Sequence, residues 1–223
     1  MRKLLIASLM FAVAATGSAS GSDGKRAAPD LALPSGPGTP PLKTTRKLGR
    51  ADFEKLQAPE FPGFDKQPHG LNDVVMETRY ITKDHPRLWA VVTIEPCKDD
   101  CWPMDLDEWK KHEADLKKKW LGPLADAPDV DWEMGKIDLH GQPLIYTYQI
   151  GQHATDGEAG GASFTDTYIL NYNDGTNKMT VVGRYADDQV QTKDMMAKLA
   201  PKGDLALLAT SFLDYFTHAW PTS

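Results

Sequence analysis

The stretch Leu88-Trp89-Ala90-Val91-Val92-Thr93-Ile94 decides the fold prediction for this chain. It is almost continuously apolar and rich in β-branched residues, which favours a β-strand covered on both faces. Before it, Val74–Ile81 alternates between two sets of side chains, as a half-exposed strand does. Lys83-Asp84-His85-Pro86 supplies turn residues between them. The sequence therefore predicts two consecutive strands joined by a turn.

A helix is predicted after this pair of strands. Asp105 is the expected N-cap, and Glu108 three residues later completes a capping box. The large apolar residues that follow recur at helical spacing, with lysines on the solvated positions: Leu106, Trp109, Leu116 and Trp120. Gly122-Pro123 is expected to end the helix.

Four more strands and two helices are predicted in the second half of the chain. The strands are Asp131–Leu139, Leu144–Ile150, a segment carrying Phe164, Tyr168, Leu170 and Tyr172, and Met179–Tyr185. The first shifts its apolar register at Gly135, which predicts a bulge. Asn173-Asp174-Gly175 is a strong hairpin signal. The helices are Lys193–Leu199 and a last one from about Asp204, whose apolar stripe predicts core packing.

This order of elements predicts an α+β fold. We expect a largely antiparallel sheet of about six strands, with a helix after the second strand and C-terminal helices packed on the sheet. From Asn72 to Trp220 the order resembles the Mog1/PsbP-like sandwich, a central antiparallel sheet with helices on its faces. That fold hosts binding and accessory proteins of several kinds. The resemblance is topological and carries no shared motif, so no functional residue is transferred from it.

The N-terminus has the pattern of a cleavable signal peptide. Met1-Arg2-Lys3 is basic, Leu4–Ala15 is uncharged and apolar, and small residues lead to Ala19. We expect cleavage after Ala19, with Ala15 as the second choice. The apolar stretch is shorter than the roughly 20 residues that a membrane-spanning helix needs. The sequence therefore predicts a soluble, exported protein, periplasmic or secreted, with no transmembrane segment in the mature chain.

Composition divides the remaining chain into two parts. Residues 20–50 are rich in Pro, Gly and Ser and contain no aromatic residue, which predicts a flexible linker, whereas 51–223 is expected to form a single domain. The formal net charge of the whole chain is -6. Cleavage removes two basic residues and no acidic one, which leaves about -8. An acidic protein repels phosphate backbones, so we expect no nucleic-acid partner.

The only two cysteines, Cys97 and Cys101, lie four positions apart between the apolar strand and the capped helix. In an oxidising compartment two neighbouring cysteines normally pair. Pairing needs Cα atoms within about 7 Å, whereas a straight strand would hold them about 13 Å apart. A turn at this proline-flanked junction brings them close enough. We therefore predict a structural disulfide.

The alternative is a thiol or copper site. Cys-x-x-x-Cys followed by proline resembles the copper-chaperone branch of the thioredoxin superfamily, although here Trp102 separates Cys101 from Pro103. The antiparallel hairpins also depart from that family. Spacing selects no third ligand among the six histidines, which are His69, His85, His112, His140, His153 and His218. We assign no metal site and no cofactor.

The long connection Gly151–Ala162 is the second candidate site. His153, Asp156 and Glu158 are its candidate binding residues, since together they can bind a cation. The spacing of a calcium loop is missing, however, which favours a mobile loop tip.

No common enzyme signature is present, and no catalytic residue is assigned. The sequence alone predicts a non-catalytic binding or accessory protein, with an unknown protein or small molecule as its partner. One alternative is an extracytoplasmic thiol or copper protein that uses Cys97 and Cys101, and another is an enzyme of unrecognised type.

Overall fold

The fold is described here from a computed structural model, which covers residues 32–99, 101–126, 130–154, 162–187, 189–190 and 192–221. The predicted signal peptide, residues 1–19, lies outside the described residues, as do residues 20–31 of the predicted linker.

The described residues form one antiparallel sheet of seven strands in the order β1-β2-β3-β7-β6-β5-β4. The strands are β1 (Phe64–Leu71), β2 (Met76–Thr82), β3 (Leu88–Pro96), β4 (Asp131–Leu139), β5 (Gln142–Ala154), β6 (Ala162–Asn173) and β7 (Asn177–Asp187). The predicted α+β class is confirmed, but the expected count of about six strands is wrong. Sequence analysis missed β1, because FDKQPHGL lacks apolar alternation and contains Pro and Gly, which are depleted in strands. Its pairing with β2 is irregular between Pro68 and Gly70.

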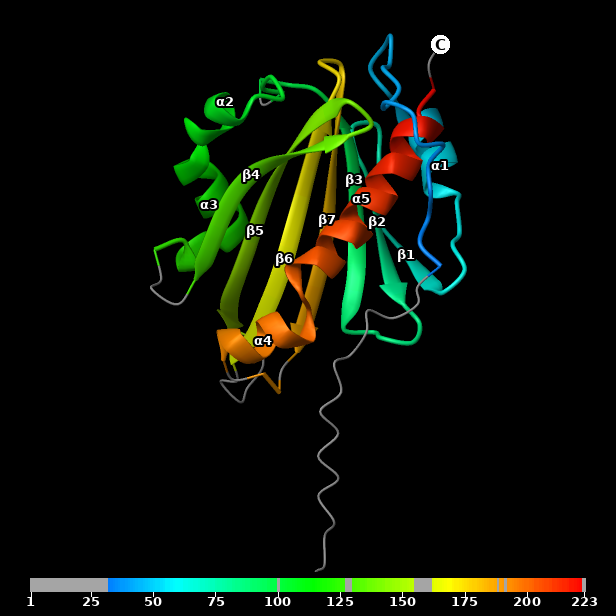
Figure 1. The fold of residues 1–223 in the computed structure, drawn as a ribbon. Helices are drawn as coiled ribbons and strands as arrows, with labels where there is room; N and C mark the ends of the chain where they lie inside the picture. The colour runs from blue at the N-terminus through cyan, green and yellow to red at the C-terminus, as the bar shows by residue number, and fades with distance from the viewer. Residues whose placement is uncertain are drawn as a thin grey trace, which may run out of the picture.

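Helices α1 (Arg50–Gln57), α4 (Lys193–Leu199) and α5 (Lys202–Ala219) pack on one side of the sheet, which we call the first face. Figure 1 shows α5 crossing this face in front of β7 and β3. Tyr80 of β2 and Phe212 of α5 are both fully buried, with ring centroids 4.8 Å apart. Gly183 of β7 allows the close approach, since a Cβ atom there would lie 2.6 Å from the carbonyl oxygen of Leu205. The C-terminal helices therefore pack on the sheet, as predicted.

Helices α2 (Leu106–Lys110) and α3 (Glu113–Leu121) lie on the opposite side, the second face, against β4 and β5. Trp109 and Leu116 are buried there against Ile145. The predicted cap is present, since the backbone N–H of Glu108 donates to the Asp105 carboxylate at 3.0 Å. The single helix expected from the sequence is broken near His112, however, and a 3-10 turn (Gly122–Leu124) follows α3. None of the helices in the described parts of the chain is long and apolar enough to cross a membrane.

Strand β3 corrects one prediction that matters for function. The continuously apolar stretch was expected to be covered on both faces, yet its exposure alternates along the strand. Leu88, Ala90, Val92 and Ile94 are buried on the first face, whereas Trp89, Val91 and Thr93 are only half-buried on the second face. The reason is topological: α2 and α3 cover the β4–β5 end of the second face and do not extend to β3.

The predicted linker is corrected for residues 32–49, which pack against the domain and which we call the strap. Leu48 is buried, and its backbone N–H donates to the Asn177 side chain at 2.9 Å. The backbone N–H and the hydroxyl of Thr44 both donate to Asp174, each at 2.6 Å. These partners belong to the β6–β7 hairpin, more than a hundred residues away in sequence. Hydrogen bonds to the domain and the burial of Pro34, Pro41 and Leu48 together order this segment.

The bulge predicted at Gly135 is absent, because β4 and β5 pair without a register shift from Asp131 to Leu139. The glycine has another role. A Cβ atom at position 135 would lie 2.6 Å from the Tyr146 ring, so the missing side chain leaves room for the tyrosine on the neighbouring strand.

Candidate functional site

The predicted disulfide between Cys97 and Cys101 is present, with the two Cα atoms 5.4 Å apart. It closes the turn between β3 and α2. The indole of Trp102 stacks on the His112 ring at 3.9 Å, and the side-chain amide of Asn173 donates to the Trp102 carbonyl at 2.9 Å. The disulfide thus lies where α2 is fastened to the sheet. Among the described residues, no group of three His, Cys, Asp or Glu side chains is placed to hold a metal ion.

The predicted binding loop is shorter than expected, because β5 continues to Ala154 and β6 begins at Ala162. His153 falls within β5 and pairs with Ser163. Asp156 and Glu158 lie outside the described residues, so this candidate cation site stays a prediction.

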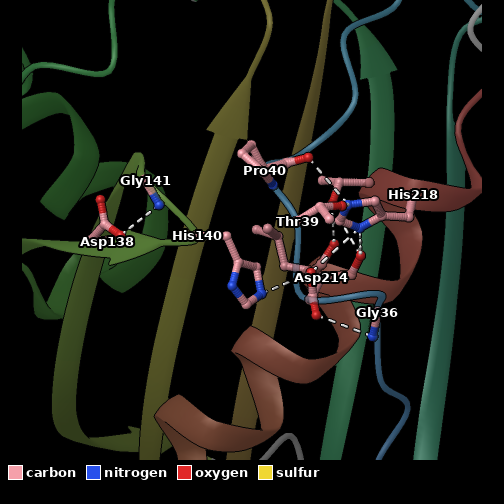
Figure 2. Close-up of polar contacts among 10 residues, drawn as sticks. Gly36, Thr39, Pro40, Asp138, His140, Gly141, Asp214 and His218 are labelled. Atoms are coloured by element: carbon pink, nitrogen blue, oxygen red, sulfur yellow. Dashed lines mark hydrogen bonds and ion pairs between the residues drawn. The ribbon is translucent and has the colours of Figure 1, made fainter.

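A polar cluster around Asp214 anchors the strap to α5 (Figure 2). The backbone N–H of Gly36 donates to the Asp214 carboxylate at 3.1 Å, and the His140 ring lies 3.5 Å from the same carboxylate. Farther along α5, the imidazole of His218 lies 3.0 Å from the Thr39 hydroxyl oxygen. The cluster joins the strap, α5 and the β4–β5 turn. These contacts give the side chains of the cluster a structural role, which is to hold the strap against the domain.

The second face carries a different polar cluster, organised by strand register. Five residues on adjacent strands form one transverse row: Trp132, Gln149, Thr167, Arg184 and Trp89. With adjacent strands about 4.8 Å apart, the row spans roughly 19 Å. The next row on the same face begins at Arg79 and ends at Thr147. Between them lie Val91, Val182 and Ile169. We call Arg79, Trp89, Trp132, Thr147, Gln149, Thr167 and Arg184 the polar band.

The polar band concentrates hydrogen-bonding atoms that have no partner. Nine buried side-chain nitrogen and oxygen atoms of the described residues lack a hydrogen bond, and six of them belong to the band. Gln149 and Thr147 are each only 1% exposed, and neither the Gln149 amide nor the Thr147 hydroxyl is paired. The other three atoms are the side-chain N–H groups of Trp132, Trp89 and Arg79 (its Nε). Native proteins pair nearly all such groups, so their concentration on one surface requires an explanation.

The band also carries two positive charges without counter-charges. The Arg79 guanidinium lies over the Trp89 ring, 5.7 Å from its centroid, and the Arg184 Nε–H donates to the Thr167 hydroxyl at 3.3 Å. Within the described parts of the chain, neither arginine forms an ion pair. Burial lowers the pKa of Arg184, and the positive charge of Arg79 nearby lowers it further. Two guanidinium groups therefore stand close together on a partly covered surface.

Comparisons with known proteins do not identify this surface. No protein-family model matches the chain, and no curated protein matches its sequence. The interpretation of the polar band therefore rests on its geometry.

Chemically, the band offers many N–H donors, few acceptors, two cations and the rings of Trp89 and Trp132. Donors and cations of this kind are complementary to the oxygen atoms of a polar molecule. Sequence analysis missed the band, because residues of six strands form it and no two of them are close in sequence except Thr147 and Gln149. One signal was available: Arg184 interrupts the otherwise apolar stretch Val181–Tyr185.

Proposed function

We propose that this chain is an exported, non-catalytic binding or accessory protein that binds a polar ligand on the polar band. The N-terminal signal pattern and the Cys97–Cys101 disulfide support an extracytoplasmic location. The resemblance to Mog1/PsbP-like sandwiches, which stays a prediction, agrees with a binding role.

The observation that carries the proposal is the unpaired, buried amide of Gln149. An unpaired buried polar group costs about 1–3 kcal/mol. Gln149 has an unpaired donor and an unpaired acceptor, and the Thr147 hydroxyl beside it adds a third such group. A fold keeps such groups at a net cost where binding uses them, because a ligand supplies the missing partners.

The experiment removes the unpaired groups and measures stability without ligand. Gln149→Met keeps the length of the side chain and removes its polar atoms, and Thr147→Val does the same for the hydroxyl. Each is expected to raise the free energy of unfolding by about 1–3 kcal/mol, as judged by urea denaturation.

Thr82→Val is the matched control. Thr82 is also fully buried, but its hydroxyl donates to the carbonyl oxygens of His85 and Leu88. Its replacement is therefore expected to lower stability. If Gln149→Met and Thr147→Val lower stability as Thr82→Val does, their polar atoms already have partners and the proposal fails.

The disulfide keeps the second candidate, a thiol or copper protein, open to test. That function requires Cys97 and Cys101 to become accessible thiols under a mild reductant and to retain copper. A thiol count before and after reduction, with bound copper measured on the same sample, decides between this candidate and a structural disulfide.

A further inference from the structure

Among the described residues, no carboxylate balances the positive charges of Arg79 and Arg184 on the polar band. This excess positive charge narrows the class of ligand. The nearest carboxylate along β2 is that of Glu77, which faces Thr93 and lies 3.4 Å from its hydroxyl. On β1, the Asp65 carboxylate lies 3.9 Å from the Lys83 ammonium group. Neither acid pairs with Arg79 or Arg184 within the part of the chain that the structure describes. This is notable in an acidic chain, where carboxylates outnumber basic groups.

Strand register brings the two charges to one place. Arg184 on β7 stands opposite Trp89 on β3, and Arg79 on β2 reaches over the same indole. Arg79 and Arg184 thus come from the two strands that flank β3, and the charge of Arg79 is near enough to lower the pKa of Arg184. Like charges held together repel, and the repulsion is removed when an anion lies between them.

The rest of the row supplies neutral hydrogen-bonding groups. Beyond Thr167, the Gln149 amide offers an unpaired donor and an unpaired acceptor, and the Trp132 indole offers a donor. An acceptor can be satisfied only by a ligand that donates, which an unsubstituted inorganic anion such as sulfate does not do. Hydroxyl groups both donate and accept.

We infer that the ligand is a hydroxylated oxyanion, a small molecule that carries a carboxylate or phosphate group beside several hydroxyl groups. Its anionic group lies between Arg79 and Arg184, and its hydroxyl groups extend along the row toward Gln149. This inference rests on the proposed function and adds to it the chemistry of the ligand.

The first test needs no ligand. Arg184→Gln removes the unbalanced charge but keeps a donor for the Thr167 hydroxyl, so we expect the melting temperature to rise by roughly 2–4 °C at low salt. Arg50→Gln is the control, because Arg50 is exposed on α1 and paired with Glu54 at 3.1 Å. It removes the same charge and is expected to leave the melting temperature unchanged. A fall for Arg184→Gln would show that its charge is already balanced and would overturn the inference.

The second test compares three probes that share one hydroxylated ring: glucose, glucuronate and glucose 6-phosphate. Titration calorimetry at constant ionic strength measures each Kd. We expect one or both anions to bind at least about tenfold more tightly than glucose. Arg184→Gln should raise the Kd of the anion at least about tenfold, whereas Arg50→Gln should leave it unchanged. A preference between the two anions identifies a carboxylate or a phosphate as the charged group.

The outcomes separate this inference from the proposed function. If glucose binds as tightly as the anions and Arg184→Gln has no effect, a polar ligand site exists but the oxyanion assignment is wrong. If none of the probes binds while Gln149→Met is stabilising, the proposed function stands and this ligand class is rejected. If Gln149→Met is destabilising, the proposed function fails by itself.

Discussion

Replacing Asp166 by asparagine is expected to change how the stability of this protein depends on pH. Asp166 lies in β6 on the first face and is completely buried. The Tyr148 hydroxyl donates to one of its carboxylate oxygens at 3.0 Å, and the other oxygen has no partner among the described residues. Burial raises the pKa of Asp166 to about 7, although hydrogen bonds from Tyr148 and the backbone of Thr167 act in the opposite direction.

The magnitude follows from proton linkage. The pKa rises from an ordinary value of 3.8 to about 7 in the folded protein. At about 1.4 kcal/mol per pH unit, this difference corresponds to about 4 kcal/mol. Because the folded state holds the proton more tightly, the contribution to stability is fully present below pH 3.8 and is lost as the pH rises to about 7. Asparagine does not titrate, so the variant lacks this loss.

Urea denaturation of both proteins between pH 4 and pH 8, followed by tryptophan fluorescence, measures the effect. The free energy of unfolding of Asp166→Asn minus that of the wild type should rise by about 4 kcal/mol across this range. Asp65→Asn makes the same replacement at an exposed carboxylate on β1 and serves as the control for the substitution itself. Tyr148→Phe removes a bond that favours the ionised form, so it should move the titration to higher pH. A constant difference for Asp166→Asn would refute the reasoning.

Three further outcomes are expected. Gly183→Ala should lower the free energy of unfolding by about 1–3 kcal/mol in urea denaturation, because its Cβ atom meets the Leu205 carbonyl oxygen at 2.6 Å. Gly203→Ala, in α5 with open space around it, should be neutral or stabilising. Asp214→Ala removes the carboxylate that accepts the Gly36 N–H, so trypsin should cleave residues 32–49 several-fold faster while the rest of the domain resists. An unchanged cleavage rate would show that the contacts with the β6–β7 hairpin are enough to hold the strap. Cys101→Ser should lower the free energy of unfolding by about 2 kcal/mol, because this is the loop-closure entropy expected for so short a disulfide loop. A larger loss would mean that the disulfide also positions α2.

Local signals in the sequence predicted much of the fold. The Asp105 cap, the Asn173-Asp174-Gly175 turn and the apolar stripe of α5 each depend on neighbours within a few residues, and each is present in the structure. The disulfide was predictable for the same reason, since only two cysteines exist and they lie four positions apart.

Segments held by distant partners could not be predicted in this way. The strap has the composition of a linker, and it is ordered by Asp174, Asn177 and Asp214. Strand β1 has no apolar alternation, and pairing with β2 makes it a strand. Local sequence patterns do not reveal the distant contacts that order these two segments.

The stretch from Leu88 to Ile94 shows the same division within one strand. Its residues alone determined that it is a strand, because β-branched and apolar side chains favour extended backbone. Whether both of its faces are covered depended on where α2 and α3 pack, and they pack at the other end of the sheet. Only the tertiary structure leaves Trp89 half-buried beside Arg79 and Arg184, since strand register brings together residues that lie about a hundred positions apart.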